Sequence, residues 1–287
     1  MTEQELINRF GRAKVEHWKE SFRNATITND FIFSKVAGNL HICKEMLRRI
    51  LGDTLEIKTV TPQSAIANFI DSKAVRLDIL VEDAEENLYD LEMQVVNSDS
   101  IPKRMRMYQA SIDTASFGKG KKYKEAKKTI IIFICISDPI GRGFPIYTFK
   151  NLCAEDHTIA LDDETLKIVV APQNWRKVKT NDDLKSLLRY LWEGTKTDTF
   201  TEEMDMCVTD IKYDQVISNE SLSYYCEIED AEDRGREEGR EEGREEGREE
   251  GRFEEKCIIA RIMKEEGYSI EEIQKISKLS KAEIQQL

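Results

Sequence analysis

Histidine is scarce in this chain of 287 residues, and long apolar runs are missing. The three histidines, His17, His41 and His157, are scattered, so a zinc site or a histidine-based nucleophilic triad has little to build on. No stretch approaches the roughly 18 consecutive apolar residues of a membrane helix. Residues 1–14 are polar and mixed in charge, unlike a secretory signal. The sequence therefore predicts neither a membrane span nor export.

Closely spaced cysteine pairs are also missing. None of the six cysteines forms a CxxC pair, and one of them lies inside an apolar run. They are Cys43, Cys135, Cys153, Cys207, Cys226 and Cys257. Without a secretion signal, this pattern predicts free thiols in a reducing compartment, and hence a cytoplasmic protein.

Positive charge is in short supply overall, which at first argues against nucleic acid as a partner. Lys and Arg number 43 against 55 Asp and Glu, a net charge of −12, whereas phosphate binding needs a basic surface. The charge is unevenly distributed, however. Residues 226–287 hold 20 acids and 12 bases, while residues 97–128 hold nine bases and three acids. The basic segment is interpreted either as a solvated helix and loop or as a phosphate-tracking surface.

The apolar share of 40% is enough for a core, and its periodicity predicts a layered α/β or α+β domain over residues 1–225. Residues 1 to about 70 are expected to be mainly helical, and one strand is expected to be buried on both faces. The expected elements are helices over 40–51, 101–117 and 184–192, and strands over 75–82, 88–96, 129–136 and 165–170, with 129–136 the fully buried strand.

The composition changes abruptly after Tyr225. Four copies of Gly-Arg-Glu-Glu occupy residues 235–250, and each glycine costs a helix about 1 kcal/mol relative to alanine. The segment 226–254 is interpreted as an acidic, partly helical tether, with a low-complexity expansion without a role as the alternative. A glycine stripe at four-residue spacing would also let two such helices approach closely, so a homo-oligomer is a further possibility.

The last segment, residues 255–287, is predicted to be a small helical module. Ser269 with Glu272 and Ser280 with Glu283 form two capping boxes, and Ile270, Ile273, Ile276 and Leu279 supply an apolar face. The spacing is similar to a helix-turn-helix that contacts DNA. A plain helical hairpin or an oligomerisation module stays open, because the glutamates are poor phosphate partners.

A predicted hairpin carries the most informative chemistry. If residues 84–86 form a three-residue loop between the strands 75–82 and 88–96, Asp78 falls directly opposite Glu92. Opposed Cβ atoms lie roughly 4.5–5.5 Å apart, so the two carboxylates repel and each raises the pKa of the other. A divalent cation such as Mg²⁺ or Mn²⁺ removes that conflict. The alternative is two exposed acids on a solvated hairpin.

Several stretches, in this order, resemble one known group of proteins. Asp78 followed by Glu92, Met93 and Gln94 is similar to the Asp…(Glu/Asp)-x-Lys pattern of PD-(D/E)XK nucleases. The closer resemblance is to the PD-(D/E)XK nuclease family transposase, or Rpn-type recombination-promoting nuclease, group. It is carried by residues 28–35, 76–80, 91–94, 104–108 and 120–123 and by the Arg-Glu-Glu-Gly tail with its helical end.

The resemblance implies a restriction-endonuclease-like mixed sheet flanked by helices. It implies that Asp78 and Glu92 bind Mg²⁺ (or Mn²⁺), with the Met93 carbonyl as a third contributor. Gln94 takes the catalytic position where many relatives place a lysine that orients the attacking water and offsets charge. Since Gln94 brings no charge, Arg104 and Lys35 are candidates for the positive role. Asp30 is a candidate to complete the site, or alternatively an N-cap for a helix beginning near Phe31.

The expected function is a metal-dependent DNA endonuclease that hydrolyses phosphodiester bonds, related to transposase and recombination-promoting nucleases. Candidate DNA-binding residues from the basic segment are Lys103, Arg106, Lys119, Lys121 and Lys122. The alternative is a catalytically weak or inactive nuclease-fold protein that acts in DNA binding or assembly, favoured by Gln94. A third reading is a scaffold that associates through the Gly-Arg-Glu-Glu repeat.

Overall fold

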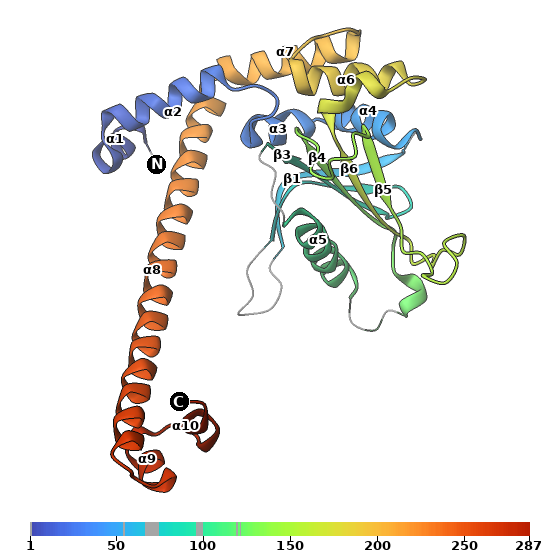
Figure 1. Ribbon diagram of the computed structural model, residues 1–287. Helices are drawn as coiled ribbons and strands as arrows, with labels where there is room; N and C mark the ends of the chain where they lie inside the picture. Colours follow the sequence, from blue (N-terminus) through green and yellow to red (C-terminus); the bar gives the residue numbers. More distant parts are fainter. Residues whose placement is uncertain (1, 54, 67–74, 96–99, 119, 121) are drawn as a thin grey trace. The chain divides into compact units, whose positions relative to one another are not determined.

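The structure is a computed structural model that describes residues 2–53, 55–66, 75–95, 100–118, 120 and 122–287 (Figure 1). It divides into two compact units, Met1–Leu222 and Ser223–Leu287. The three-part division predicted from composition, with boundaries at 225 and 254, stays a prediction. None of the helices in the described part of the chain is both long enough and apolar enough to cross a membrane.

A six-stranded mixed sheet forms the centre of the first unit, with strand order β1-β2-β3-β4-β6-β5. β2 pairs antiparallel with both β1 and β3. β4 lies parallel to both β3 and β6, and β5 pairs antiparallel with β6. Their bounds are β1 Ile57–Ile66, β2 Val75–Asp83, β3 Leu88–Gln94, β4 Thr129–Cys135, β5 Ile146–Phe149 and β6 Thr165–Val170. Every residue of β4 is buried, which confirms the prediction drawn from its β-branched run.

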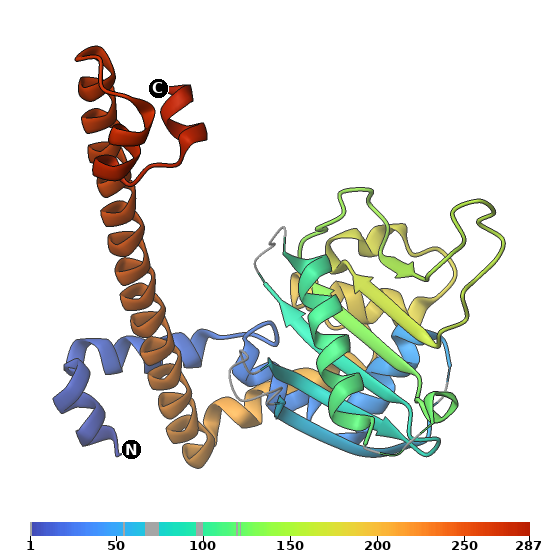
Figure 2. The same ribbon diagram turned by 90° about the horizontal axis from the view of Figure 1, so that it is seen from below.

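Helices cover both faces of this sheet. α3 and α4 lie on one face, and α5 lies across the other, as Figures 1 and 2 show from two directions. Met105 and Ile112 of α5 pack in one apolar cluster with Ile131 and Phe133 of β4. The helices of this unit are α1 Glu3–Phe10, α2 Arg12–Asn24, α3 Asp30–Ala37, α4 Leu40–Leu51, α5 Ile101–Ser116, α6 Asp182–Glu193, α7 Thr199–Tyr213 and the start of α8 Gln215–Glu265, with 3-10 turns η1 Tyr123–Glu125 and η2 Pro172–Lys177. The restriction-endonuclease-like architecture is therefore confirmed.

Two predicted helix ends coincide with glycines in the left-handed region. α4 ends at Gly52 (φ 82°) and α6 ends at Gly194 (φ 67°), where a residue with a Cβ is strained. At the other ends, Asn39 and Asn181 accept hydrogen bonds from backbone N–H groups of the first turn.

The expectation that residues 1 to about 70 are mainly helical is wrong for β1. This strand pairs with β2 through Val60 opposite Val81 and Pro62 opposite Ile79. β1 is an edge strand, so one side of its backbone has no neighbouring strand, and Pro62, which has no N–H to donate, is tolerated there. Because of its polar residues and proline, this strand lacks the regular apolar pattern by which a strand is recognised in a sequence.

In the second unit, the Gly-Arg-Glu-Glu repeat lies within one continuous helix, α8, of 51 residues. Residues 231–255 are all exposed. The end of α8 packs with α9 Ile270–Ser277 and α10 Lys281–Gln286 around a small core of Ala260, Met263, Ile273, Leu279 and Ile284. Both capping boxes are confirmed. Ile276, expected on the apolar face, is 60% exposed instead.

Candidate active site

The β2–β3 turn fixes the register of the hairpin. The Asp83 carboxylate accepts hydrogen bonds from the N–H groups of Glu85 (2.9 Å) and Asn87 (2.8 Å) and from the Tyr89 hydroxyl (2.8 Å). The strands then pair with Ile79 opposite Leu91. This is the register predicted from a three-residue loop.

Beyond the pair Ile79 and Leu91, side chains instead of backbone carbonyls accept the hydrogen bonds between the two strands. Glu92 Oε1 accepts the Asp78 N–H at 2.7 Å, and Asp78 Oδ2 accepts the Met93 N–H at 2.9 Å. Each acid is therefore held by the backbone of the opposite strand. The structure brings Asp78 and Glu92 together as the register predicted.

The environment of these acids penalises negative charge. Burial raises the pKa of Asp78 to about 6, even though the Met93 N–H bond lowers it, and the nearby Asp30 charge raises it further. Glu92 is 2% exposed, and its pKa is raised well above the ordinary value by burial and then by the charges of Asp90 and Asp78. The exposed-hairpin alternative is wrong, because Glu92 is buried and Asp78 is partly buried.

Asp90 is a member of the cluster that the sequence did not single out. Its side chain is fully buried, and neither of its carboxylate oxygens has a hydrogen-bond partner among the described residues. Burial raises its pKa well above the ordinary value. The neighbouring Glu92 carboxyl lowers this pKa in part, because a proton on one of the two groups can be shared with the other. Its spacing of two residues from Glu92, on the same strand face, was the available signal.

Arg104, from the first turn of α5, supplies positive charge at this site. Its guanidinium donates one hydrogen bond to Gln94 Oε1 and another to the Tyr108 hydroxyl (3.0 Å). It also lies 5.4 Å from the ring centres of both Tyr108 and Phe133. The amide of Gln94 donates in turn to the Met93 carbonyl at 2.8 Å. Arg104, hydrogen-bonded to Gln94, thus supplies the positive charge that a lysine at position 94 would bring.

Of the two remaining candidates, Asp30 lies with the charged groups of the site and Lys35 pairs elsewhere. Asp30 belongs to the charge cluster, since it raises the pKa of Asp78, while burial raises its own pKa and Arg104 lowers it. The N-cap alternative is wrong for Asp30, because Asn29 caps α3 by accepting from the Ile32 N–H at 3.2 Å. Lys35 forms an ion pair with Glu220 at 2.5 Å, so its ammonium is committed away from the carboxylates.

Residues 27–141 match the family model described as PD-(D/E)XK nuclease family transposase. The match covers 115 of the 287 residues. The matched range holds every member of the cluster, from Asp30 in α3 to Arg104 in α5. Comparison with curated proteins and with solved structures gives no match.

Divalent cations are typical of PD-(D/E)XK nucleases, and the residues at this site fit one. Within the described ranges, no group of three or more His, Cys, Asp or Glu side chains has the geometry of a metal cage. Mg²⁺ does not require such a cage, because it commonly binds through one or two carboxylates and keeps several waters. Asp78, Glu92 and the Met93 carbonyl provide that donor set. The orphaned oxygens of Asp90 and the raised pKa values show an excess of buried negative charge that a cation would neutralise.

The candidate DNA-binding residues fall at two places. Lys103 and Arg106 are exposed in the first turns of α5, beside Arg104. Lys122 lies just before η1, near the beginning of β4, whose first residue pairs with Leu88 at the start of β3. From Leu88, β3 runs a further four residues to Glu92, about 13 Å at roughly 3.3 Å per residue. The assignment of Lys122 to DNA binding stays a prediction. Lys119 and Lys121 lie outside the described residues.

Proposed function

We propose that the chain is a metal-dependent DNA endonuclease that hydrolyses phosphodiester bonds in transposition or recombination. The observation that carries the proposal is the meeting of Asp78 and Glu92 where the hairpin ladder ends, with Arg104 linked to the same site through Gln94. The nuclease family of residues 27–141 supports it.

Each residue has a role in this proposal. A bound Mg²⁺ or Mn²⁺ ion would supply Lewis-acid chemistry and lower the pKa of a water molecule. Asp78 and Glu92 would hold the ion with their carboxylate oxygens. Gln94 orients the Arg104 guanidinium, whose fixed positive charge stabilises the negative charge that develops on the phosphate. The rings of Tyr108 and Phe133, which meet edge to face, keep that guanidinium in place.

A plasmid-cleavage assay tests the proposal. The purified chain is incubated with supercoiled plasmid in Mg²⁺, in Mn²⁺ and in EDTA. We expect nicking or linearisation in either metal, none in EDTA, and none with Asp78→Asn or Glu92→Gln. Glu82→Gln is the matched control, since Glu82 is an acid of the same strand that pairs with Lys58 at 2.7 Å. Cleavage by Asp78→Asn and Glu92→Gln at the parent rate would show that the site is misassigned.

A second candidate function is DNA binding or assembly without efficient cleavage. It is favoured by Gln94, which is uncharged and whose amide already bonds the Met93 carbonyl. Calorimetric titration with Mg²⁺ separates the two functions. Heat of binding that disappears in Asp78→Asn supports the nuclease, whereas DNA binding without metal binding supports the second candidate. A cytoplasmic location and a homo-oligomer through the C-terminal tail stay proposals as well.

A further inference from the structure

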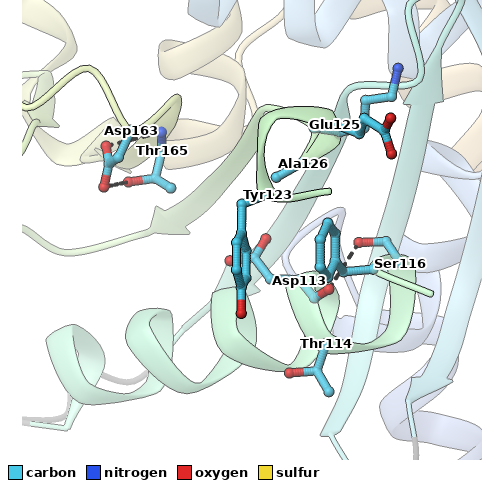
Figure 3. A pocket seen from close by; sticks show the side chains of 10 residues that line it. Asp113, Thr114, Ser116, Tyr123, Glu125, Ala126, Asp163 and Thr165 are labelled. Atoms are coloured by element: carbon cyan, nitrogen blue, oxygen red, sulfur yellow. Dashed lines mark hydrogen bonds between the residues drawn. The ribbon is translucent and has the colours of Figure 1, made fainter. Parts of the chain in front are cut away.

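A pocket of about 390 Å³ lies at the far end of α5 from Arg104. The end of α5, the η1 turn and the start of β6 line it, as Figure 3 shows for Asp113, Tyr123 and Thr165. The strand register puts Thr165, on the pocket wall, level with Leu88, four residues or about 13 Å along β3 from Glu92. None of the proposed catalytic residues takes part in it.

An exposed aromatic stack forms one wall of this pocket. The rings of Phe117 and Tyr123 are nearly parallel, 8° apart, with centroids separated by 5.8 Å. Tyr123 is 91% exposed, the reverse of what a tyrosine in a core shows. A solvated ring backed by a second ring offers a rigid flat surface on which another planar ring can stack.

The polar groups of the pocket are mostly acceptors. Asp113 accepts the Thr129 hydroxyl through Oδ1 at 2.7 Å, and Glu125 accepts the Lys122 N–H through Oε2 at 3.0 Å. The hydrogen bonds described for these two acids use one oxygen each. Carboxylate oxygens repel phosphate but accept from the amino groups of nucleobases, as they do from cytosine.

Exposed lysines lie next to the aromatic wall in the sequence. Lys122 and Lys124 are exposed on either side of Tyr123 in the sequence, and Lys127 lines the pocket while pairing with Glu86 at 3.0 Å. The interior therefore suits an uncharged planar ring with N–H donors, while the rim suits phosphate. A nucleotide has both parts, joined in that order.

We propose that this pocket binds an unpaired nucleobase of a single-stranded DNA segment, which stacks on Tyr123 while Lys122 and Lys124 contact the adjoining phosphates. The inference rests on the proposed nuclease function for its choice of DNA. It adds a substrate class, namely DNA with an unpaired stretch. At about 3.4 Å per stacked nucleotide, roughly 13 Å along the sheet corresponds to about four nucleotides between the bound base and Glu92.

Binding of fluorescent single-stranded oligonucleotides to the full chain tests the pocket. Anisotropy is measured in EDTA, so that cleavage plays no part in the result. Base stacking on an aromatic ring is worth enough to make Tyr123→Ala bind roughly 5- to 150-fold more weakly. Tyr123→Phe keeps the ring and is expected to bind like the parent. Tyr213→Ala is the matched control, because Tyr213 is also a surface tyrosine, 87% exposed.

Two further arms identify what is recognised. Tyr123→Ala is expected to leave binding of a blunt duplex and of an abasic oligonucleotide unchanged. Lys124→Gln is expected to reduce the slope of log affinity against log salt by about 0.7 for single strands. Parent-like binding of single strands by Tyr123→Ala would overturn the inference, as would an equal loss for the abasic oligonucleotide. Tyr123-dependent binding without plasmid cleavage would instead refute the nuclease proposal and leave the pocket standing.

Discussion

Asp78→Asn is predicted to make the metal-free protein more stable at pH 8, although it removes a residue of the candidate site. Burial raises the pKa of Asp78 from 3.8 to about 6. The difference corresponds to about 3 kcal/mol of folding free energy lost when the group ionises, at about 1.4 kcal/mol for each tenfold change in acidity. An asparagine keeps an oxygen for the Met93 N–H without the charge.

The predicted gain depends on pH in a defined direction. The stability that a neutral Asp78 provides is fully present below pH 3.8 and is lost as the pH rises through about 6. The advantage of Asp78→Asn is therefore small at pH 4 and reaches about 1–3 kcal/mol at pH 8, where the lower figure allows for relaxation of the hairpin. For a unit of this size, 2 kcal/mol raises the melting temperature by about 4–8 °C.

Thermal unfolding between pH 4 and pH 8, in EDTA and in Mg²⁺, measures both effects. Mg²⁺ is expected to stabilise the parent at pH 8, by about 2.7 kcal/mol at one hundred times its dissociation constant, and to have little effect on Asp78→Asn. Glu82→Gln, on the same strand, serves as the control without a gain. A less stable Asp78→Asn at pH 8 in EDTA, or a gain that is the same at pH 4, would refute the reasoning.

Three other outcomes follow from described contacts. Arg49→Met is expected to cost about 2–4 kcal/mol in urea unfolding, less than a fully buried pair, because the 5% exposed Arg49 bonds the partly buried Asp198 at 2.6 Å and its loss removes that ion pair. Arg104→Ala is expected to lower the cleavage rate about 100- to 1,000-fold. Arg104→Lys is expected to recover only part of that rate, because lysine cannot bond both Gln94 and Tyr108 with one planar group. Plasmid-cleavage kinetics at saturating Mg²⁺ measure both variants. Ile273→Ala, in the core of the second unit, is expected to cost about 2–5 kcal/mol there and to leave plasmid cleavage unchanged, which circular dichroism of the helices and the cleavage assay together check.

The hairpin register was predictable because a short turn and strict alternation leave few ways to pair two strands. The sequence also predicted β4 and the ends of α4 and α6, where the signals are local: a β-branched run and glycines at helix ends. β1 was not predictable in this way, because its proline and polar residues are permitted only by its place at the sheet edge. That place is set by the tertiary fold.

The candidate site was predictable in its pair and not in its surroundings. Asp78 and Glu92 follow from register alone. The burial of Asp90 depends on α5 and β4 closing over its strand face, and the bond from Arg104 to Gln94 depends on where α5 begins. The location of Lys122 depends on the parallel pairing of β3 with β4, which returns the chain to the opposite end of the sheet.

The hydrogen bonds at the end of the hairpin ladder determine how the two carboxylates are oriented. Each of Asp78 and Glu92 uses one oxygen to bond the neighbouring backbone, through Oδ2 and Oε1 respectively. That bond fixes the rotamer of the carboxylate, so the second oxygen is already oriented and little conformational entropy remains to be lost on ion binding. A carboxamide has a single oxygen and must choose between the backbone and an ion. Isosteric amide variants therefore divide the two duties of each acid, keeping the strand pairing while giving up the ion, and the exchange rates of the Asp78 and Met93 amide protons report which duty each oxygen performs.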